Sequence, residues 1–416
     1  MSNDAILIVG AGFAGIGMAI RLKQAGIHDF TVLERADRLG GTWRDNTYPG
    51  AACDVPSHLY SYSFEPNPSW SRRFAPQGEI LAYLEHCADK YGVRRHIRFG
   101  TSVTGASFDE HSGLWTVQIN DSDALTARVL VSGSGHRLSR PMYPNIVGRD
   151  EFRGKTMHSA RWDHDYPIEG KRVAVIGTGC SAIQIVPSIA PTVGRLHIFQ
   201  RTASWLLPKP DRGIPPRVQV VFRRRPLVQK IARSVIYWVL EAFAVGYVLC
   251  PRLNAIRERR ALRYLERSIR DPALRAKLVP KFRLGCKRIL ISNDYYAALQ
   301  RENVELVTDG IAEIREHSIV TSDGTEHPVD AIVYATGFET VEAKPPFAIR
   351  GRGGHDLRDA SRDGIEAYLG TSIAGFPNLF LLVGPNLVLG HSSMIFMMES
   401  QFAYVLDALR TLRTGR

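Results

Sequence analysis

Two stretches of the chain repeat one pattern, and this repetition constrains the fold more than any other feature. Residues 5–35 and 171–201 each begin with a short β-branched run, turn through glycines into an amphipathic helix and end in a second strand. The spacing agrees, because Gly10 to Glu34 and Gly177 to Arg201 each span 24 positions. Such short apolar runs are typical of buried parallel strands. The sequence therefore predicts a duplicated βαβ unit and, with it, two dinucleotide sites.

The first glycine turn has the residues that a dinucleotide phosphate needs. Gly10, Gly12 and Gly15 follow a strand and open a helix. The first glycine permits the tight turn, the second lets backbone approach a pyrophosphate, and the third lets helix and strand pack closely. Glu34 ends the second strand, where a carboxylate accepts hydrogen bonds from ribose hydroxyls. The pattern favours a dinucleotide without a ribose phosphate; the alternative is a glycine-rich turn with no ligand.

The second turn, Gly177-x-Gly179-x-x-Ala182, has the same form but a different ending. Its second strand ends in Gln200-Arg201, with no acid. A carboxylate would repel a ribose 2′-phosphate, whereas an arginine pairs with it through two hydrogen bonds. We expect NADPH here and FAD at the first site, because two dinucleotides in one chain suit electron transfer between cofactors. The alternative is that Arg201 is a solvated surface residue.

The remaining organisation fits a chain of 416 residues with two or three domains. A loop-rich stretch (40–76), a helix (78–91) and alternating strands (103–108 and 115–119) separate the two glycine turns. A basic helical segment (210–281) follows the second turn, and a helix is expected at about 392–413. The predicted fold class is α/β, with two Rossmann-like dinucleotide-binding domains and a helical insertion. In chain order we expect the first part of the FAD domain (1–140), the first part of the NADPH domain (141–209), the insertion (210–285), the second part of the NADPH domain (286–340) and the second part of the FAD domain (341–416).

Composition argues against several other classes. The formal net charge is +12, but no DNA- or RNA-binding motif accompanies it, so nucleic acid is not an expected partner. No two of the five cysteines form a C-x-x-C pair, which indicates reduced thiols in the cytosol. We expect no metal, no signal peptide and a cytoplasmic location. The apolar stretch 234–250 contains Glu241 and is slightly short for a membrane span, so a buried or membrane-grazing helix is expected.

Six motifs occur in order along the chain. They include the segment Phe152-x-Gly154-x-x-x-His158-x-x-x-Trp162-Asp163 just before the second glycine turn, the loop at residues 40–60, and Lys287-Arg288 with the residues that follow. Together these motifs resemble the Baeyer–Villiger monooxygenases, a branch of the class B flavin monooxygenases, where they correspond to the family fingerprint, the flavin-side loop and the catalytic-arginine segment. The resemblance covers most of residues 5–410 and is weakest at 211–280.

The resemblance implies a flavoprotein monooxygenase in which an FAD C4a-peroxide inserts one oxygen atom into a ketone, giving an ester or lactone. The implied partners are FAD, NADPH, O2 and a small organic substrate, a ketone or a related compound. Membrane contact is allowed but not predicted, and the oligomeric state stays open. His158 is interpreted as conformational, because the family uses it structurally. The resemblance also carries over the family's cofactor contacts residue by residue. Besides the first glycine turn and Glu34, the implied FAD contacts are Thr42, Trp43, Asp54, Tyr60, Val103 and Met394. The implied NADPH contacts are Gly177, Thr178, Gly179, Ser181, Ala182, Arg201, Thr202, Lys287 and Arg288.

Arg288 and Asp54 are the candidate catalytic residues. Oxygenation of a ketone by a peroxide needs a positive group beside the flavin, to hold the charge of the peroxide and of the tetrahedral adduct. Arginine stays protonated and supplies charge and donors without quenching the peroxide. The family implies that Asp54 holds Arg288 in place and that Lys287 joins Arg201 and Thr202 on the 2′-phosphate. From the residues alone, a turn-capping Asp54 and a surface Lys287-Arg288 pair are equally open.

Two further functions stay open at this stage, and a third is disfavoured. The chain ends soon after a helix that stops near Arg413, whereas relatives continue for several dozen residues and use them to close part of the flavin and substrate region. A non-catalytic flavoprotein or an uncoupled NADPH oxidase is therefore an alternative. A second alternative keeps the cofactors and oxygenates nitrogen or sulfur. The third, a disulfide reductase, needs a redox-active cysteine pair that the sequence lacks.

The assignment of Arg201 to a 2′-phosphate gives a direct prediction. Arg201→Ala removes one charge-assisted hydrogen bond worth about 1.5–3 kcal/mol, so the KM for NADPH should rise far more than the KM for NADH. Steady-state kinetics with the two cofactors measures both changes. Equal effects on NADPH and NADH would contradict the assignment.

Overall fold

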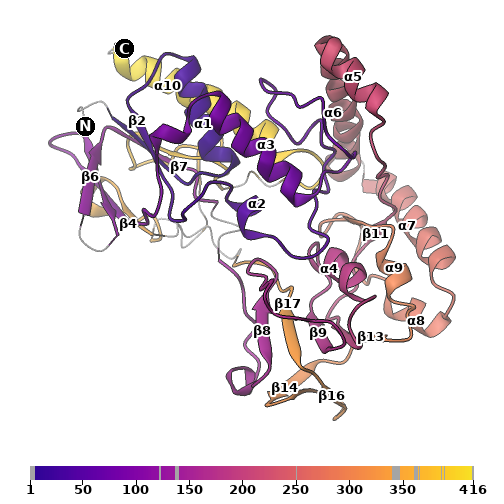
Figure 1. Ribbon diagram of the computed structural model, residues 1–416. Coiled ribbons are helices and arrows are strands. Elements are labelled where there is room, and N and C mark those ends of the chain that lie inside the picture. Colours follow the sequence, from indigo (N-terminus) through magenta and orange to yellow (C-terminus); the bar gives the residue numbers. More distant parts are fainter. Residues whose placement is uncertain are drawn as a thin grey trace.

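The computed structural model describes residues 5–120, 123–135, 140–249, 251–339, 347–359, 364, 366–385, 387 and 389–414 (Figure 1). Its architecture is α/β, as predicted, and it is built on two separate five-stranded parallel sheets. Each sheet contains one of the two repeated βαβ segments. The predicted domain boundary at 340–341 lies outside the described residues. The other boundaries remain proposals.

The first sheet holds the N-terminal glycine turn. Its central strand pairs in parallel on both sides, with Ile6 opposite Phe30 and Val129. All four residues of that strand are buried, which is why the sequence shows a continuous apolar run there. In sheet order the strands are β19 (Leu379–Leu381), β7 (Val129–Ser132), β1 (Ile6–Val9), β2 (Phe30–Leu33) and β3 (Ile97–Arg98).

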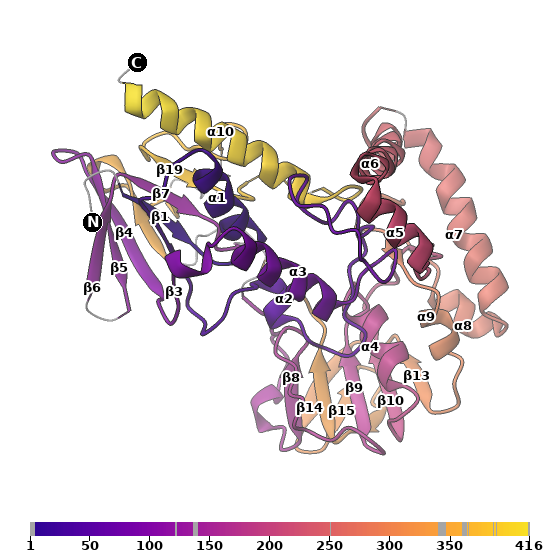
Figure 2. The ribbon, with the colours of Figure 1, turned by 45° about the horizontal axis from the view of Figure 1, so that its top comes forward.

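Side-chain alternation along β1 supplies two different cores. Ile6 and Ile8 pack with the helices α1 (Phe13–Gln24), α3 (Gln77–Lys90) and α10 (Met394–Thr414), whereas Leu7 and Val9 pack on the opposite face against a small sheet. Helix α10 lies along α1, so the C-terminal segment covers the N-terminal unit (Figure 2). The small sheet consists of β18 (Ala348–Arg350), β4 (Val103–Asp109), β5 (Leu114–Ile119) and β6 (Asp123–Ala127).

The second sheet repeats this arrangement around the other glycine turn. Val173 and Val175 face helices, whereas Ala174 and Ile176 face a three-stranded meander. In sheet order the strands are β13 (Val304–Val307), β10 (Arg195–Phe199), β9 (Arg172–Ile176), β17 (Ala331–Tyr334) and β8 (Lys155–His158). The helices are α4 (Ala182–Ile189) and α9 (Tyr295–Ala298), and the meander is β14 (Ile311–Arg315), β15 (Ser318–Thr321) and β16 (Glu326–Pro328).

A helical segment leaves and rejoins the second unit through two short paired strands, β11 (Leu206–Leu207) and β12 (Leu290–Ile291). No described helix is long and apolar enough to cross a membrane. The apolar stretch near 234–250 lies in the longest helix, α6, and Trp238 on it is 68% exposed. A buried or membrane-grazing helix was expected here; the buried alternative is wrong for that side of α6, and the membrane-grazing alternative stays a prediction. The segment contains α5 (Pro216–Arg224), α6 (Pro226–Val248), α7 (Asn254–Ser268) and α8 (Pro272–Lys277).

The remaining short elements connect these layers. Helix α2 (Thr42–Asp45) belongs to the loop-rich stretch that the sequence placed after the first βαβ unit. The predicted helix at 78–91 and the predicted C-terminal helix are present as α3 and α10, displaced by one or two residues at their ends. Among the described residues there are also the 3-10 turns η1 (Arg94–His96), η2 (Arg149–Glu151), η3 (Pro251–Leu253) and η4 (Arg352–Gly354).

The contact between α1 and α10 gives a stability prediction. Phe402 is fully buried, and a Cβ added at Gly17 would lie 2.6 Å from its ring, so the two helices approach closely here. Phe402→Ala should lower the free energy of unfolding by about 3–5 kcal/mol, because a buried ring is lost and a cavity remains. Thermal unfolding followed by circular dichroism measures the change. The exposed neighbour Arg410 is the control, and an equal Tm for Phe402→Ala and Arg410→Ala would contradict the prediction.

Candidate active site

The first glycine turn connects β1 to α1 and has no room for side chains. Gly10 has φ +98°, and a Cβ there would lie 2.7 Å from the Gly133 carbonyl oxygen. A Cβ at Gly15 would lie 1.9 Å from the Gly10 oxygen, so this glycine is required for the helix to start against the strand. No side chain caps the N-terminus of α1 at Gly12, so its first N–H groups are available to an anion. The turn fits a dinucleotide pyrophosphate.

Glu34 is buried beside this turn and is held in a fixed position. Its Oε2 accepts a hydrogen bond from the Ala11 N–H at 2.8 Å, and its Oε1 accepts from the Ala36 N–H at 3.0 Å and from Arg44 Nη1 at 2.8 Å. A carboxylate can accept about four hydrogen bonds, so these three leave one on Oε2. A ribose hydroxyl can use that position, which fits the dinucleotide expected at this turn.

The other flavin-side residues fall into two places. Thr42 and Trp43 open α2, where Trp43 Nε1 donates to the Tyr60 hydroxyl at 3.0 Å and burial raises the pKa of Tyr60. Val103 opens β4 and packs in the core that also contains Leu33, next to the end of the strand that leads to Glu34. Val103 and the Trp43–Tyr60 pair thus belong to different elements, and their roles at the adenine and ring ends of FAD remain proposals.

Met394 begins helix α10, whose next residue, Ile395, is buried in the core against which Trp43 and Tyr60 also pack. The ring of its neighbour Phe396 lies 4.8 Å from the Tyr237 ring of α6, measured between centroids. Helix α10 therefore joins the flavin-binding unit to the helical insertion close to the predicted site.

The second glycine turn connects β9 to α4 and repeats the geometry of the first. Gly177 has φ +112°, and a Cβ there would lie 2.5 Å from the Ala335 oxygen. A Cβ at Gly179 would meet no atom within 4 Å, so the space above it is open. Ser181 precedes α4 without capping it, and Ala182 is buried at its first position. This turn also fits a pyrophosphate.

The predicted 2′-phosphate residues are only partly together. Thr178 Oγ1 donates to the Thr202 oxygen at 3.2 Å, so the glycine turn and the end of β10 are joined. Arg201 precedes Thr202 and is exposed. Lys287 Nζ lies 4.9 Å from the centre of the Phe282 ring. No described contact links Lys287 to Arg201 or Thr202, so its assignment to the phosphate remains a proposal.

An ion pair joins Arg288 to Asp54 across 234 positions of sequence. Arg288 Nη2 lies 2.6 Å from Asp54 Oδ2 and 2.7 Å from Oδ1, and the negative charge of Asp54 raises the pKa of Arg288 further. The arginine side chain is 52% exposed and the aspartate side chain 27%, so solvent screens the attraction between them. The pair therefore orients the guanidinium more than it stabilises the fold. The contact that the family resemblance implied is present.

Gln184 on α4 is a residue that sequence reasoning missed. Its Nε2 donates to the Ala52 oxygen at 3.0 Å, and its Oε1 accepts from the Ala52 N–H at 3.3 Å and from the Tyr48 hydroxyl at 3.1 Å. The loop that carries Asp54 is therefore clamped onto the second dinucleotide unit. A glutamine on a helix has no local signal for this role.

Arg233 on α6 was missed for the same reason. Its Nη1 donates to the carbonyl oxygens of His58, Leu59 and Ser61 at 2.8, 3.1 and 2.9 Å. These three residues surround Tyr60, so the insertion holds the flavin-side loop in shape. Burial lowers the pKa of Arg233, but an arginine remains protonated at neutral pH.

His158 of the fingerprint is fully buried at the end of β8. Its Nδ1 accepts a hydrogen bond from the Ala160 N–H at 3.1 Å, which places the ring proton on Nε2, 2.9 Å from the Gly337 oxygen. Burial lowers the pKa of His158 and keeps the ring neutral. This tie between β8 and the segment after β17 agrees with a conformational role and not with acid or base chemistry.

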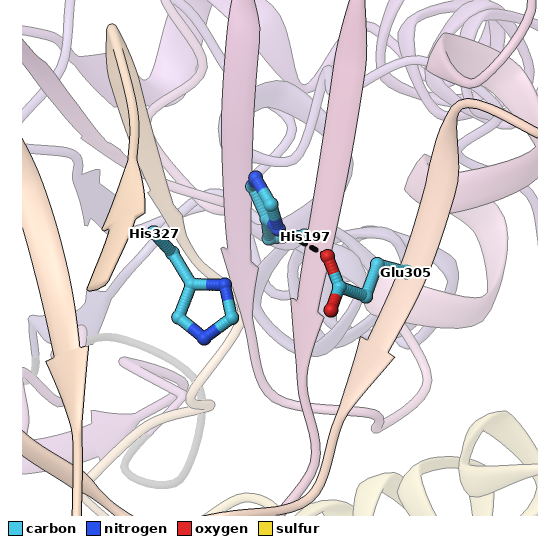
Figure 3. A group of neighbouring side chains, drawn as sticks. All are labelled: His197, Glu305 and His327. Carbon is cyan, nitrogen blue, oxygen red and sulfur yellow. Dashed lines mark ion pairs between the residues drawn. The ribbon is translucent and has the colours of Figure 1, made fainter. Parts of the chain in front are cut away.

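One group of three described side chains could present metal ligands together. His197, Glu305 and His327 come from β10, β13 and β16, and their ligand atoms lie within 4.8 Å of one another (Figure 3). However, Arg195 Nη2 already lies 2.8 Å from Glu305 Oε2, the oxygen nearest to His197 Nδ1 at 3.2 Å. A guanidinium at that oxygen disfavours a cation there. The absence of a metal therefore stays our prediction.

Known proteins resemble this chain over nearly its whole length. A family model described as flavin-binding monooxygenase-like matches residues 3–248. A Baeyer-Villiger monooxygenase of Pseudomonas aeruginosa is 49% identical over 408 residues, covering 98% of this chain and 77% of that protein. One of Streptomyces coelicolor is 48% identical over 407 residues, covering 98% and 78%.

Solved structures show the same relationship. A crystal structure of OTEMO in complex with FAD and NADP superposes with a TM-score of 0.90 at 31% identity, covering 100% of this chain and 87% of that one. The open crystal structure of cyclohexanone monooxygenase gives a TM-score of 0.88 at 30% identity, covering 99% and 88%. Fold and site thus define a flavoprotein with two dinucleotide sites, for FAD and NADPH. The chain belongs to the flavin-binding monooxygenase-like family, within its Baeyer–Villiger branch.

His197 in the second core gives a pH prediction. Burial lowers its pKa to about 4, below the ordinary value of about 6.5. The unfolded chain therefore binds more protons between these values, and the free energy of unfolding should fall as the pH is lowered from about 6.5 towards 4. Replacing the ring by His197→Phe should make that fall shallower, as measured by urea unfolding at a series of pH values. The exposed His317→Phe is the control, and identical slopes for all three proteins would contradict the prediction.

Proposed function

We propose that this protein oxygenates ketones, inserting one oxygen atom of O2 to give an ester or lactone at the expense of NADPH. Its family, its two dinucleotide units and the names of its relatives support an FAD- and NADPH-dependent monooxygenase. The observation that carries the proposal is the Arg288–Asp54 ion pair, 2.6 Å long, which links the segment after the insertion to the flavin-side loop.

The residues of the first unit would hold FAD, which when bound and reduced by NADPH supplies the activation of O2. The backbone of the first glycine turn would receive the pyrophosphate, and Glu34 would accept from a ribose hydroxyl through its remaining position. Thr42, Trp43 and Tyr60 would line the flavin side together with Met394. Val103 would contact the adenine end, near Glu34.

Arg288 would supply the positive charge that ketone oxygenation needs. Negative charge develops on oxygen as the nucleophile forms and as the carbonyl becomes tetrahedral, and a fixed guanidinium stabilises both. Because the carboxylate of Asp54 raises the pKa of Arg288, the guanidinium keeps its proton and does not neutralise the nucleophile. Asp54 itself would act as a positioning residue. Gln184 holds the backbone of Ala52, two residues before Asp54, and so fixes the loop that carries the carboxylate.

The second unit would select NADPH. Gly177, Thr178, Gly179, Ser181 and Ala182 would receive the pyrophosphate, and Arg201 and Thr202 would contact the 2′-phosphate. We extend this group to Lys287, which requires its ammonium to leave the Phe282 ring, 4.9 Å away, when NADPH binds. Side-chain rotation of an exposed lysine is fast and inexpensive, so this movement is no obstacle.

Arg288→Ala is the central test. The variant should still reduce its flavin with NADPH, but its ketone oxygenation should fall by at least about 100-fold, because a fixed charge in the reacting region is lost. Anaerobic absorbance of the flavin measures reduction, and gas chromatography of the ester measures oxygenation. The exposed Arg283→Ala, from the same segment, is the matched control and should retain both activities.

The products distinguish this proposal from its alternatives. Loss of ester with release of hydrogen peroxide in Arg288→Ala supports the assigned role. Normal ketone turnover in that variant would overturn it. Hydrogen peroxide without ester from the unmodified protein, across a ketone series, would indicate an uncoupled oxidase. Oxygenated amines or sulfides as the main products would show that the enzyme acts on nitrogen or sulfur compounds, with the same two cofactors.

A further inference from the structure

Helix α6 carries a continuous apolar side that the described part of the molecule does not cover. We call it the outer face of α6 and define it by Leu227, Ile231, Val235, Trp238, Val239 and Val245. Leu227 is 69% exposed and Trp238 68%. The residues recur at helical spacing, so they lie along one side of the helix. Soluble monomers rarely expose apolar patches of this extent without a partner.

The opposite side of α6 is already occupied by the protein. Arg233 donates to three carbonyl groups of the flavin-side loop, and Gln229 Nε2 donates to the Asn67 oxygen at 2.7 Å. Tyr237 contacts Phe396, and Glu241 lies 3.4 Å from His391. The helix is therefore fixed in orientation, and its outer face cannot rotate inward without breaking these contacts.

The charge around the outer face has one sign. Residues 212–240 contain seven basic residues, of which six are arginines, and no aspartate or glutamate. Three of them, Arg223, Arg224 and Arg225, are exposed at the junction of α5 and α6, and Lys230 is exposed within the first turns of α6. A long apolar side flanked by exposed arginines and lysine, with a tryptophan at its centre, is typical of helices that lie in a lipid–water interface.

We propose that the outer face of α6 docks on an anionic lipid surface. The apolar side chains would enter the boundary of the acyl region, and Arg223, Arg224, Arg225 and Lys230 would contact lipid phosphates. A second copy of this chain is a poorer occupant, because a two-fold contact would bring the exposed positive charges of Arg223, Arg224, Arg225 and Lys230 against the same charges of the other copy. The helix would lie on the surface and not cross it, since no described helix is long and apolar enough to span a membrane.

Vesicle binding of the full FAD-loaded chain tests the proposal. Co-sedimentation with vesicles of equal parts phosphatidylglycerol and phosphatidylcholine should capture the protein, and high salt or pure phosphatidylcholine should release it. The double variant Ile231→Asp, Trp238→Asp should weaken binding by at least about tenfold, because charged groups would enter the apolar region. A triple Arg→Gln change at 223–225 should weaken it to a similar extent and reduce the salt dependence.

Two controls keep the outcomes separate. Val147→Asp changes a side chain that is 72% exposed but far from α6 in the sequence, and this variant should bind as the unmodified protein does. Flavin absorbance and circular dichroism verify that every variant is folded. Failure of the unmodified protein to bind anionic vesicles, or equal binding by the Trp238 double variant, would overturn the proposal. So would a stable dimer, seen by light scattering, that dissociates in that double variant.

Discussion

The contact between the loop at residues 48–54 and helix α4 fixes how the two dinucleotide-binding units meet. At Gly50, which has φ +82°, a Cβ would lie 2.3 Å from Ser188 Oγ and 2.6 Å from the Gln184 oxygen, so only glycine permits the approach. Gln184 then exchanges two hydrogen bonds with the Ala52 backbone. Because Asp54 follows two residues later, this contact determines where its carboxylate can meet Arg288.

The helical insertion contributes to the site as much as the two sheets do. Arg233 holds the loop around Tyr60 from one side, and Arg288 follows the end of the insertion on the other. The candidate catalytic charge is therefore positioned by three parts of the chain that are far apart in sequence. A shift of any one part would move the guanidinium, its carboxylate or the flavin-side loop relative to the others, which explains why such a site needs a rigid frame.

Burial explains why the apolar runs in the sequence predicted the two parallel sheets. Each parallel sheet has helices on one face and a smaller, mainly antiparallel sheet on the other, so the buried positions of its central strand are apolar, as in residues 6–9. The glycine turns were equally visible, because close backbone contacts at Gly10 and Gly177 exclude every other residue type. The Arg288–Asp54 contact, in contrast, was expected only from the family resemblance, since no spacing rule connects residues 234 positions apart.

The sequence by itself determined the two βαβ units with their glycine turns and, through the resemblance of its motifs, the family. The units follow from local steric requirements that each segment carries within itself. Tertiary structure alone decided the roles of Gln184 and Arg233, because a polar residue on a helix has the same local pattern whether it faces solvent or a distant loop. It also decided that the apolar side of α6 faces outward: an amphipathic repeat specifies which residues share a face, but only packing determines what that face meets.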